Sequence, residues 1–155
     1  MHEQYVGIDF VATAKLAAGL CGGLFAGAAV YISLVEHPAR MACGTELAAT
    51  EFGPSYRRAA VMQATLAIVG TVAAIFAWLA GEGTMWLVGG ALLGAVVPFT
   101  LLAILPTNKR LLDLARDRSS DETRLLLVRW GRLHEVRSVL SSAAVLIFLW
   151  ALTAG

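Results

Sequence analysis

The sequence predicts an all-α membrane protein, built as an antiparallel bundle of four transmembrane helices in a single domain over residues 1–155. Two observations predict this class. Only 15% of the residues are charged and 58% are hydrophobic, whereas soluble domains carry about 25% charged residues. The charges also gather in a few segments, and they leave four apolar runs of membrane length between them.

The four apolar runs cover about residues 11–35, 59–80, 85–105 and 136–154. A helix of about 20 residues, with a rise of 1.5 Å each, crosses the hydrocarbon core of a bilayer. Only Gly81-Glu82-Gly83-Thr84 separates the second run from the third. Such a short link forces the two helices into an antiparallel hairpin.

The two longer connections, residues 36–58 and 106–135, are predicted to be loops with some helix of their own. Pro38 and Pro54 each suit the first turn of a helix, where the missing N–H costs nothing. Ser119 followed by Glu122 is typical of a capping box. It predicts a short amphipathic helix before the fourth span, although the pattern can also continue as one helix to the end of the chain.

Lys and Arg are distributed unevenly along the chain. Of the 12 Lys and Arg residues, all but Lys15 lie in or beside the two long connections. The positive-inside rule therefore places these connections in the cytoplasm and both termini outside. We expect a multi-pass protein of the bacterial inner membrane, with the lipid bilayer as a partner. The basic residues form no aromatic-studded groove, so no nucleic acid is expected.

Small residues in the apolar runs predict close helix contacts. Gly19, Gly23 and Gly27 follow one another at four-residue spacing, and Gly90 and Gly94 repeat the pattern in the third run. Small residues at this spacing let two helix backbones approach closely in lipid. We expect packing inside the bundle, with a homo-oligomer through the same faces as the alternative. Pro98 is expected to kink the third span near Gly94.

One polar stripe crosses from a basic segment into an apolar run. Trp130, His134, Arg137 and Ser141 lie at i, i+4, i+7 and i+11, which is one side of a helix. Ionisable groups at the membrane boundary usually pair or serve a site. Nearby arginines favour the neutral form of a histidine, which is then available as a base.

The other helices bring polar residues to the same end of the bundle. Ser33, His37 and Arg40 lie at i, i+4 and i+7 where the first run ends. The further candidates are Glu36 beside this stripe, Tyr56 and Gln63 at the second run, Asn108 and Arg110 after the third, and Arg132 before the fourth. The competing interpretation treats most of these residues as interfacial anchors.

Cofactor ligands are weakly indicated. The sequence has no Glu-x-x-His or His-x-x-x-His pair and no suitable cysteine pair, so no metal site is expected. His37 and His134 could ligate a haem from two helices, and this is the alternative to a cofactor-free site.

Several blocks carry a resemblance to a known family. They are Gly23-Leu24-Phe25-Ala26-Gly27, Glu36-His37-Pro38-Ala39-Arg40, Tyr56-Arg57-Arg58-Ala59, Pro98-Phe99-Thr100, Pro106-Thr107-Asn108-Lys109-Arg110-Leu111 and Trp130-Gly131-Arg132-Leu133-His134-Glu135-Val136-Arg137. Over nearly its whole length the chain resembles the anthrone oxygenase-like family of small four-span membrane proteins. Many bacterial members have no assigned function, and the named activity belongs to fungal polyketide pathways.

The resemblance implies oxidation of a flat, hydrophobic, phenolic substrate by molecular oxygen, without a cofactor. Such chemistry needs a base at the acidic carbon and cations around the developing oxyanion. From residue type and placement, His134 is the candidate base, and Arg132, Arg137 and Arg110 are candidates to stabilise the enolate oxygen. Asn108 and Tyr56 could orient the substrate and Trp130 could stack on it.

Three further candidates complete the expected binding set, namely His37, Glu36 and Gln63, with Ser141 as the deepest member of the stripe. Two functions of other classes compete with the oxygenase. One is a haem- or quinone-binding redox protein. The other is a non-enzymatic scaffold or lipid-binding subunit whose basic end holds anionic head groups.

Overall fold

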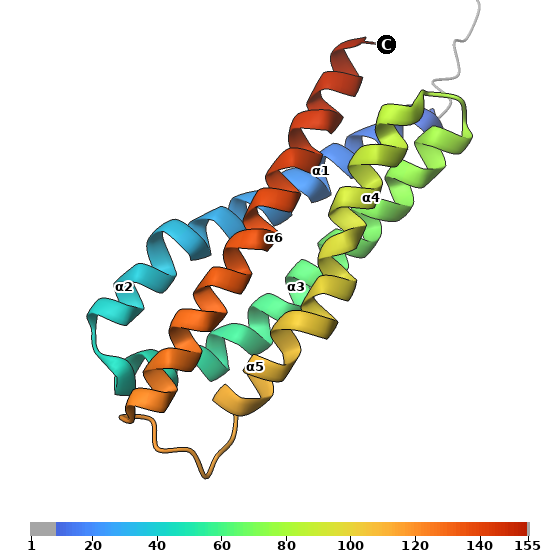
Figure 1. Ribbon diagram of the computed structural model, residues 1–155. Coiled ribbons are helices and arrows are strands. Elements are labelled where there is room, and N and C mark those ends of the chain that lie inside the picture. The colour runs from blue at the N-terminus through green and yellow to red at the C-terminus, as the bar shows by residue number, and fades with distance from the viewer. Residues whose placement is uncertain (1–8, 155) are drawn as a thin grey trace, which may run out of the picture.

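The computed structural model describes residues 9–154, and these residues form four long helical rods (Figure 1). The first rod consists of α1 (Phe10–Tyr31), the π-helical segment η1 (Ile32–Glu36) and α2 (His37–Ala42), and the second is α3 (Thr45–Leu79). The third consists of α4 (Thr84–Phe99), the π-helical segment η2 (Thr100–Ile104) and α5 (Leu105–Leu111), and the fourth is α6 (Asp121–Ala154). All four rods are long and apolar enough to cross a membrane. The predicted all-α class is confirmed.

The rods form a closed ring in which each packs against two neighbours. α1 packs against α3 and α6, and α4 packs against the same two helices from the opposite side. The start of α1, the turn between α3 and α4, and the end of α6 lie at one end of the bundle (Figure 1). The links between α2 and α3 and between α5 and α6 lie at the other end. Successive rods are therefore antiparallel.

The tight hairpin between α3 and α4 forms where the sequence predicts it. Gly81 and Gly83 adopt φ values of 91° and 99°, a region that only glycine enters without strain. Glu82 between them pairs with Lys15 of α1 at 2.6 Å. The ion pair ties the first helix to this turn.

The two long connections contain more helix than the sequence predicts. Residues 36–58 are helical except at 43–44, and the helical rods also extend into 106–135 from both sides. Gly44, at φ 96°, provides the break, so α3 begins at Thr45. Pro54 consequently lies inside α3, and its prediction at a first turn is wrong.

The fourth rod is one continuous helix, so the segment before the fourth span is part of α6. Its cap is one residue later than predicted, because Ser120 Oγ accepts the N–H of Thr123 at 3.3 Å. Glu122 is not part of a capping box with Ser119. It pairs instead with Arg110 at 2.6 Å and with Arg116 at 3.2 Å, and hydrogen bonds from Arg116 and Arg110 hold the pKa of the Glu122 carboxyl below its usual range.

Two rods contain a π-helical segment directly before a proline. In η1 the N–H of His37 bonds to the carbonyl of Ile32, and in η2 the N–H of Leu105 bonds to that of Thr100. Pro38 and Pro106 follow immediately. A proline has no N–H and its ring clashes with the carbonyl four residues earlier, and the wider π turn relieves this conflict. In the third rod the helical register changes at residues 100–104, after Pro98. The kink expected near Gly94 stays a prediction.

Small residues bring the helices together at the end of the bundle away from the basic links. A Cβ placed on Gly90 would lie 3.0 Å from Ala74, and one on Gly94 would lie 3.1 Å from Thr71. Both glycines thus pack inside the bundle as predicted. The same expectation is wrong for Gly23 and Gly27, since no described residue lies within 4 Å of a Cβ at either position.

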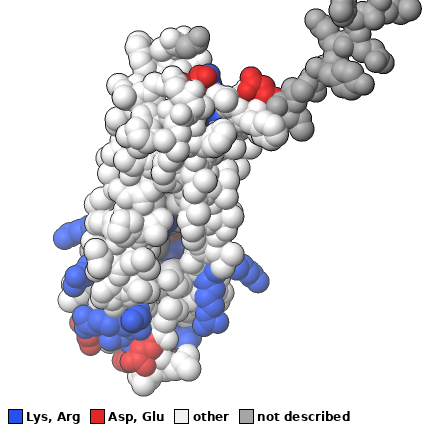
Figure 2. Space-filling model, turned by 90° about the vertical axis from the view of Figure 1, so that its right-hand side faces the viewer, with Lys and Arg blue, Asp and Glu red and all other residues white. Residues whose placement is uncertain are grey.

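The charges are concentrated at the end of the bundle that carries the two long links (Figure 2). The wall above this end is almost free of charge on the face shown, and a few charged side chains reappear at the opposite end. The polar residues that the sequence assigns to one end of the bundle are therefore gathered there.

Candidate active site

A cavity of about 210 Å³ lies inside the bundle at the inner border of the basic end. Its polar side chains are Glu36, Arg40, Ser55, Tyr56, Gln63, Thr100, Trp130, His134 and Arg137. The remaining walls are apolar and come from Phe25, Ile32, Phe52, Ala59, Ala60, Ala64, Ala67, Val96, Val97 and Leu101. A cavity of about 150 Å³ takes up benzene, so this one has room for more than a single aromatic ring.

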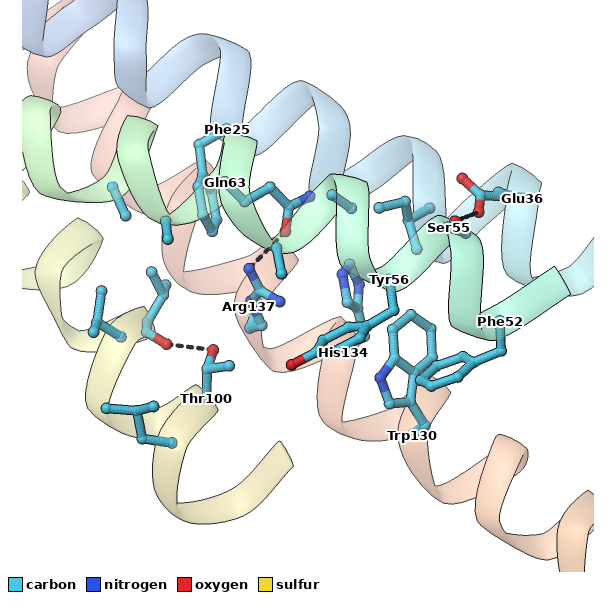
Figure 3. A pocket seen from close by; sticks show the side chains of 18 of the residues that line it. Phe25, Glu36, Phe52, Ser55, Tyr56, Gln63, Thr100, Trp130, His134 and Arg137 are labelled. Atoms are coloured by element: carbon cyan, nitrogen blue, oxygen red, sulfur yellow. Dashed lines mark hydrogen bonds between the residues drawn. The ribbon is translucent and has the colours of Figure 1, made fainter. Parts of the chain in front are cut away.

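Trp130 is the centre of an aromatic wall on one side of the cavity (Figure 3). Its ring stacks on His134 with centroids 4.8 Å apart and meets Phe52 edge-on at 5.3 Å. The guanidinium of Arg40 lies 5.8 Å from the centroid of the same ring. Flat rings around a small space favour a flat ligand, because aromatic faces stack on one another.

Ser33 contacts the His134 imidazole, and Ser138 contacts Ser33. Ser33 Oγ lies 3.2 Å from His134 Nδ1 and 2.8 Å from Ser138 Oγ, and Ser138 Oγ is 3.4 Å from the His134 carbonyl. Either hydroxyl can donate in the Ser33–Ser138 contact. In the tautomer with the proton on Nδ1, Ser33 accepts from the imidazole and the lone pair is on Nε2. His134, which is only 1% exposed, can thus act as a proton acceptor in the cavity that it lines.

Arg137 places a positive charge deeper in the cavity, beside Gln63 of α3 (Figure 3). Its Nη2 donates to Gln63 Oε1 at 2.6 Å, and its guanidinium lies 5.2 Å from the centroid of the Phe25 ring. No carboxylate of residues 9–154 pairs with it, and its buried Nε has no hydrogen-bond partner among them. An unpaired cation in an apolar setting is costly, and an anionic ligand would relieve that cost.

A second polar group closes the cavity toward the basic end. Arg40 pairs with Glu36, and its Nε lies 2.8 Å from a carboxylate oxygen of Glu51. Ser55 Oγ donates to Glu36 at 2.9 Å, which links α3 to the first rod. On the outer side of this group lies a broad groove, which Glu36, Arg40 and Ser55 also line. The charged group therefore separates the cavity from the surface of the basic end.

Six of the residues predicted for the site line the cavity, namely Trp130, His134, Arg137, Tyr56, Gln63 and Glu36. The other five lie outside it, namely Arg132, Arg110, Asn108, His37 and Ser141. Arg132 is two residues from His134, on the far side of α6, and is exposed. Arg110 is exposed at the end of α5, where it pairs with Glu122.

The remaining three predicted residues do not line the cavity. His37 packs against Trp130 with centroids 5.2 Å apart, and a Cβ on Gly131 would lie 2.5 Å from its Nε2. Ser141 Oγ donates to the carbonyl of Arg137 at 2.7 Å, so its hydroxyl serves its own helix. Asn108 is 1% exposed, and its amide has no hydrogen-bond partner among the described residues.

Sequence reasoning missed most of the apolar lining and the role of Arg40. A signal for Arg40 was present, since it follows Glu36 by four residues, the spacing of helical ion pairs. Phe52 was hidden because the connection that contains it was expected to be a loop. The alanines of α3 carry no chemical signal, and only the packing shows that they face the cavity.

Comparison with known proteins assigns the family. The anthrone oxygenase family model matches residues 52–147, a segment that includes most of the cavity lining. The chain belongs to the anthrone oxygenase family. It is 24% identical to the anthrone oxygenase of Claviceps purpurea (strain 20.1), over 94% of this chain and 92% of that protein. It is 29% identical to anthrone oxygenase tpcL of Aspergillus fumigatus, over 83% of each chain.

No solved structure matches the chain. Both of these curated relatives are fungal, so the comparisons do not bear out the expected bacterial setting. The four membrane-length helices, together with this family, make the chain an integral membrane protein. Its membership also supports an oxygenase of the anthrone oxygenase type.

Proposed function

We propose that the protein oxidises a flat, apolar, phenolic substrate of the anthrone type with molecular oxygen, without a cofactor. The observation that carries this proposal is that His134 and Arg137 line the same largely apolar cavity. Arg137 has no carboxylate partner among the described residues. Trp130 and Phe52 supply flat surfaces beside them. The family of the chain and the names of its relatives point to the same substrate class.

The proposed reaction makes few demands on a protein. The CH₂ carbon of an anthrone is acidic, because its carbanion is an aromatic enolate. The base removes one proton from this carbon, and the enolate transfers electrons to oxygen to give a carbon-bound hydroperoxide. Removal of the second hydrogen of that carbon, with cleavage of the O–O bond, gives the quinone carbonyl and one water. One anthrone and one O₂ thus yield one anthraquinone and one H₂O.

His134 is proposed as the base, acting through Nε2. Ser33 would position it through the contact with Nδ1, with the proton on that nitrogen, and Ser138 contacts Ser33 in turn. A positioned base contributes about 10²–10⁴-fold to a proton transfer. The second proton removal would use the same imidazole after it has released the first proton.

Arg137 is proposed to stabilise the enolate oxygen. Its charge is unpaired among the described residues and Gln63 fixes its position, so it is preorganised for an anion that develops during the reaction. Of the three arginines that sequence analysis considered for this role, Arg110 and Arg132 lie outside the cavity. Trp130 would stack on the substrate, and Tyr56 would help to orient it.

We also propose that the basic end of the bundle faces the cytoplasm and both termini face outside. The support is the concentration of Lys and Arg at one end (Figure 2) and the tendency of such residues to remain on the cytoplasmic side. The haem alternative finds less support in the cavity. His134 lines the cavity, whereas His37 does not line it and packs against Trp130 and Gly131.

The test is oxygen uptake by membranes that contain the protein, with anthrone as the substrate and membranes without the protein as the background. Wild type should consume one O₂ per anthraquinone formed, and His134→Ala should lower kcat by about 10²–10⁴-fold. The control is Glu135→Gln, at an exposed neighbouring position of the same helix, which should keep wild-type activity. Equal rates for wild type and His134→Ala would refute His134 as the base, and background rates for wild type would refute the function.

A further inference from the structure

The cavity reaches the outer surface of the bundle between α3 and η2. Among its lining residues, the exposed ones are Ala64 of α3 and Leu101 of η2, the latter 57% exposed. The lining side chains of α1, η1 and α6 are buried or half-buried, as shown by Phe25, Ile32 and His134. The first and fourth rods therefore contribute no exposed lining residue, and the exposed lining residues lie on the second and third rods.

The reason for the gap is a change in the contact between these two rods. Farther along, α3 and α4 touch closely, since a Cβ on Gly70 would lie 2.7 Å from Leu93 and one on Gly94 would lie 3.1 Å from Thr71. Nearer the basic end, the small side chains of Ala60 and Ala64 of α3 line the cavity, as do Thr100 and Leu101 of η2. Two methyl groups cannot fill the space that leucine fills elsewhere, and the rods leave an opening.

The rim of this opening is mostly apolar. It includes Thr100, whose hydroxyl donates to the Val96 carbonyl at 2.6 Å and so is satisfied within its own rod. The outward neighbours Val61 and Leu102 are 73% and 79% exposed, as expected for side chains that face lipid. Figure 2 looks onto the side of α3 and α4, and it shows basic atoms inside a gap in the uncharged wall.

The other route to the cavity is obstructed. Toward the basic end, Glu36, Arg40 and Ser55 form the linked polar group described above, and Arg40 is only 8% exposed. A ligand that came from water at that end would have to break these contacts. A ligand dissolved in the bilayer would meet mainly apolar side chains, among them Ala64 and Leu101.

We propose that the opening between α3 and η2 is an access route by which a flat, apolar, membrane-dissolved ligand enters the cavity sideways from the bilayer. The proposed function supplies the class of ligand, and the route itself does not depend on any reaction. Ala60 and Ala64 keep the opening wide enough for a ring system. Once inside, the ligand lies between Trp130 and Arg137.

The test measures binding kinetics in lipid nanodiscs, with 9,10-anthraquinone as the probe. Added anthraquinone partitions into the lipid first, and quenching of tryptophan fluorescence then reports its arrival at the cavity. The signal from the site is the part of the quenching that is present in wild type and absent in Trp130→Phe. Ala64→Phe narrows the opening, and Val61→Phe is the matched control on the outer face of the same helix, because Val61 does not line the cavity.

A blocked route slows entrance and exit alike. Ala64→Phe should therefore lower both rate constants by about tenfold or more and leave Kd within about threefold of wild type, whereas Val61→Phe should match wild type. Ala64→Leu, a smaller obstruction at an exposed position, should give an intermediate slowing.

Three outcomes would overturn the proposal. They are unchanged rates in Ala64→Phe, a weaker affinity with an unchanged association rate, and a slowing by Ser55→Phe that Ala64→Phe does not produce. Absence of Trp130-dependent quenching in wild type would overturn it as well. If the route passes this test while anthrone-dependent oxygen uptake fails, the oxygenase function falls and the access route stands.

Discussion

The same four rods pack in two different ways along their length. In the half away from the basic links, glycines and alanines face one another, and a Cβ on Gly89 would lie 2.5 Å from the Phe148 ring. In the half toward the basic links, the facing positions carry Trp130, His134 and Arg137, and a cavity remains. The distance between packed helices depends on the side chains at the contact, so one bundle can be tight at one end and hollow at the other.

The two halves of the bundle differ in what they contribute: one half provides tight packing, and the other half holds the cavity. The tight half contains Phe148 stacked on Trp86 at 5.5 Å, and both side chains are fully buried. The hollow half holds an unpaired guanidinium and an imidazole among apolar walls, which are arrangements that cost stability. Functional sites commonly carry such a cost, and the rest of the fold offsets it.

The largest expected effect comes from Arg137→Met, which removes the charge and keeps the length of the side chain. Loss of a preorganised oxyanion partner should lower kcat by about 10²–10³-fold. Removal of a buried charge should at the same time raise the free energy of unfolding by about 1–3 kcal/mol. Oxygen uptake and thermal unfolding in detergent measure the two effects. A loss of stability would show instead that the Arg137–Gln63 hydrogen bond mainly supports the fold.

The tight half should respond to a single added methyl group. Gly89→Ala should destabilise the protein by about 1–3 kcal/mol through overpacking, because the Phe148 ring is fully buried against Trp86 and has nowhere to move. Gly23→Ala makes the same change where no described residue is near, and it should stabilise by about 0.5–1 kcal/mol. Thermal unfolding of both variants tests the contrast, and equal shifts would contradict it.

A smaller effect is expected when His134 loses its positioning bond. Ser33→Ala should lower kcat by about tenfold, corresponding to about 1–1.5 kcal/mol for one hydrogen bond, with KM nearly unchanged. Ser33→Thr restores a hydroxyl and should recover most of the activity. Failure of Ser33→Thr to recover, together with a changed KM, would show that Ser33 shapes the cavity instead of holding the imidazole.

The smallest effect should come from the exposed basic link. Arg118→Glu reverses a charge that makes one 3.4 Å contact with Thr50, far from the proposed base, and anthrone oxidation should stay within about twofold of wild type because exposed pairs contribute little. Arg116 is less suitable for this test, since it bonds to the carbonyl of Arg110 at 2.7 Å and pairs with Glu122. A larger loss in Arg118→Glu than in His134→Ala would favour the lipid-binding function.

The sequence was sufficient for the four rods and for part of the site. Hydrophobic run length determines the rods, and the i, i+4, i+7 spacing brings Trp130, His134 and Arg137 to the cavity because α6 is a regular helix over that stretch. Ser141 continues the same spacing, yet its hydroxyl turns to a backbone carbonyl of its own helix. Periodicity gives the side of a helix and says nothing of the direction that a hydroxyl takes.

The stripe of Ser33, His37 and Arg40 illustrates the opposite case. Their spacing predicts one side of an α-helix, but Ser33 lies within the π-helical segment η1, whereas His37 and Arg40 lie in α2. Ser33 contacts His134 and Arg40 lines the cavity, whereas His37 packs outside it against Trp130. No residue pattern in a single sequence marks a π-helical segment with certainty, and a proline nearby is the only local sign here.

Each π-helical segment amounts to one additional residue inserted into a helix, and an added residue turns everything beyond it by about 100°. The side chains of α2 and α5 are therefore rotated by about this angle from the positions that an uninterrupted α-helix would give them. The direction in which side chains point at the basic end is therefore set independently of the glycine contacts at the far end. Residues inserted or exchanged at one end of a rod need not disturb the helix packing at the other end.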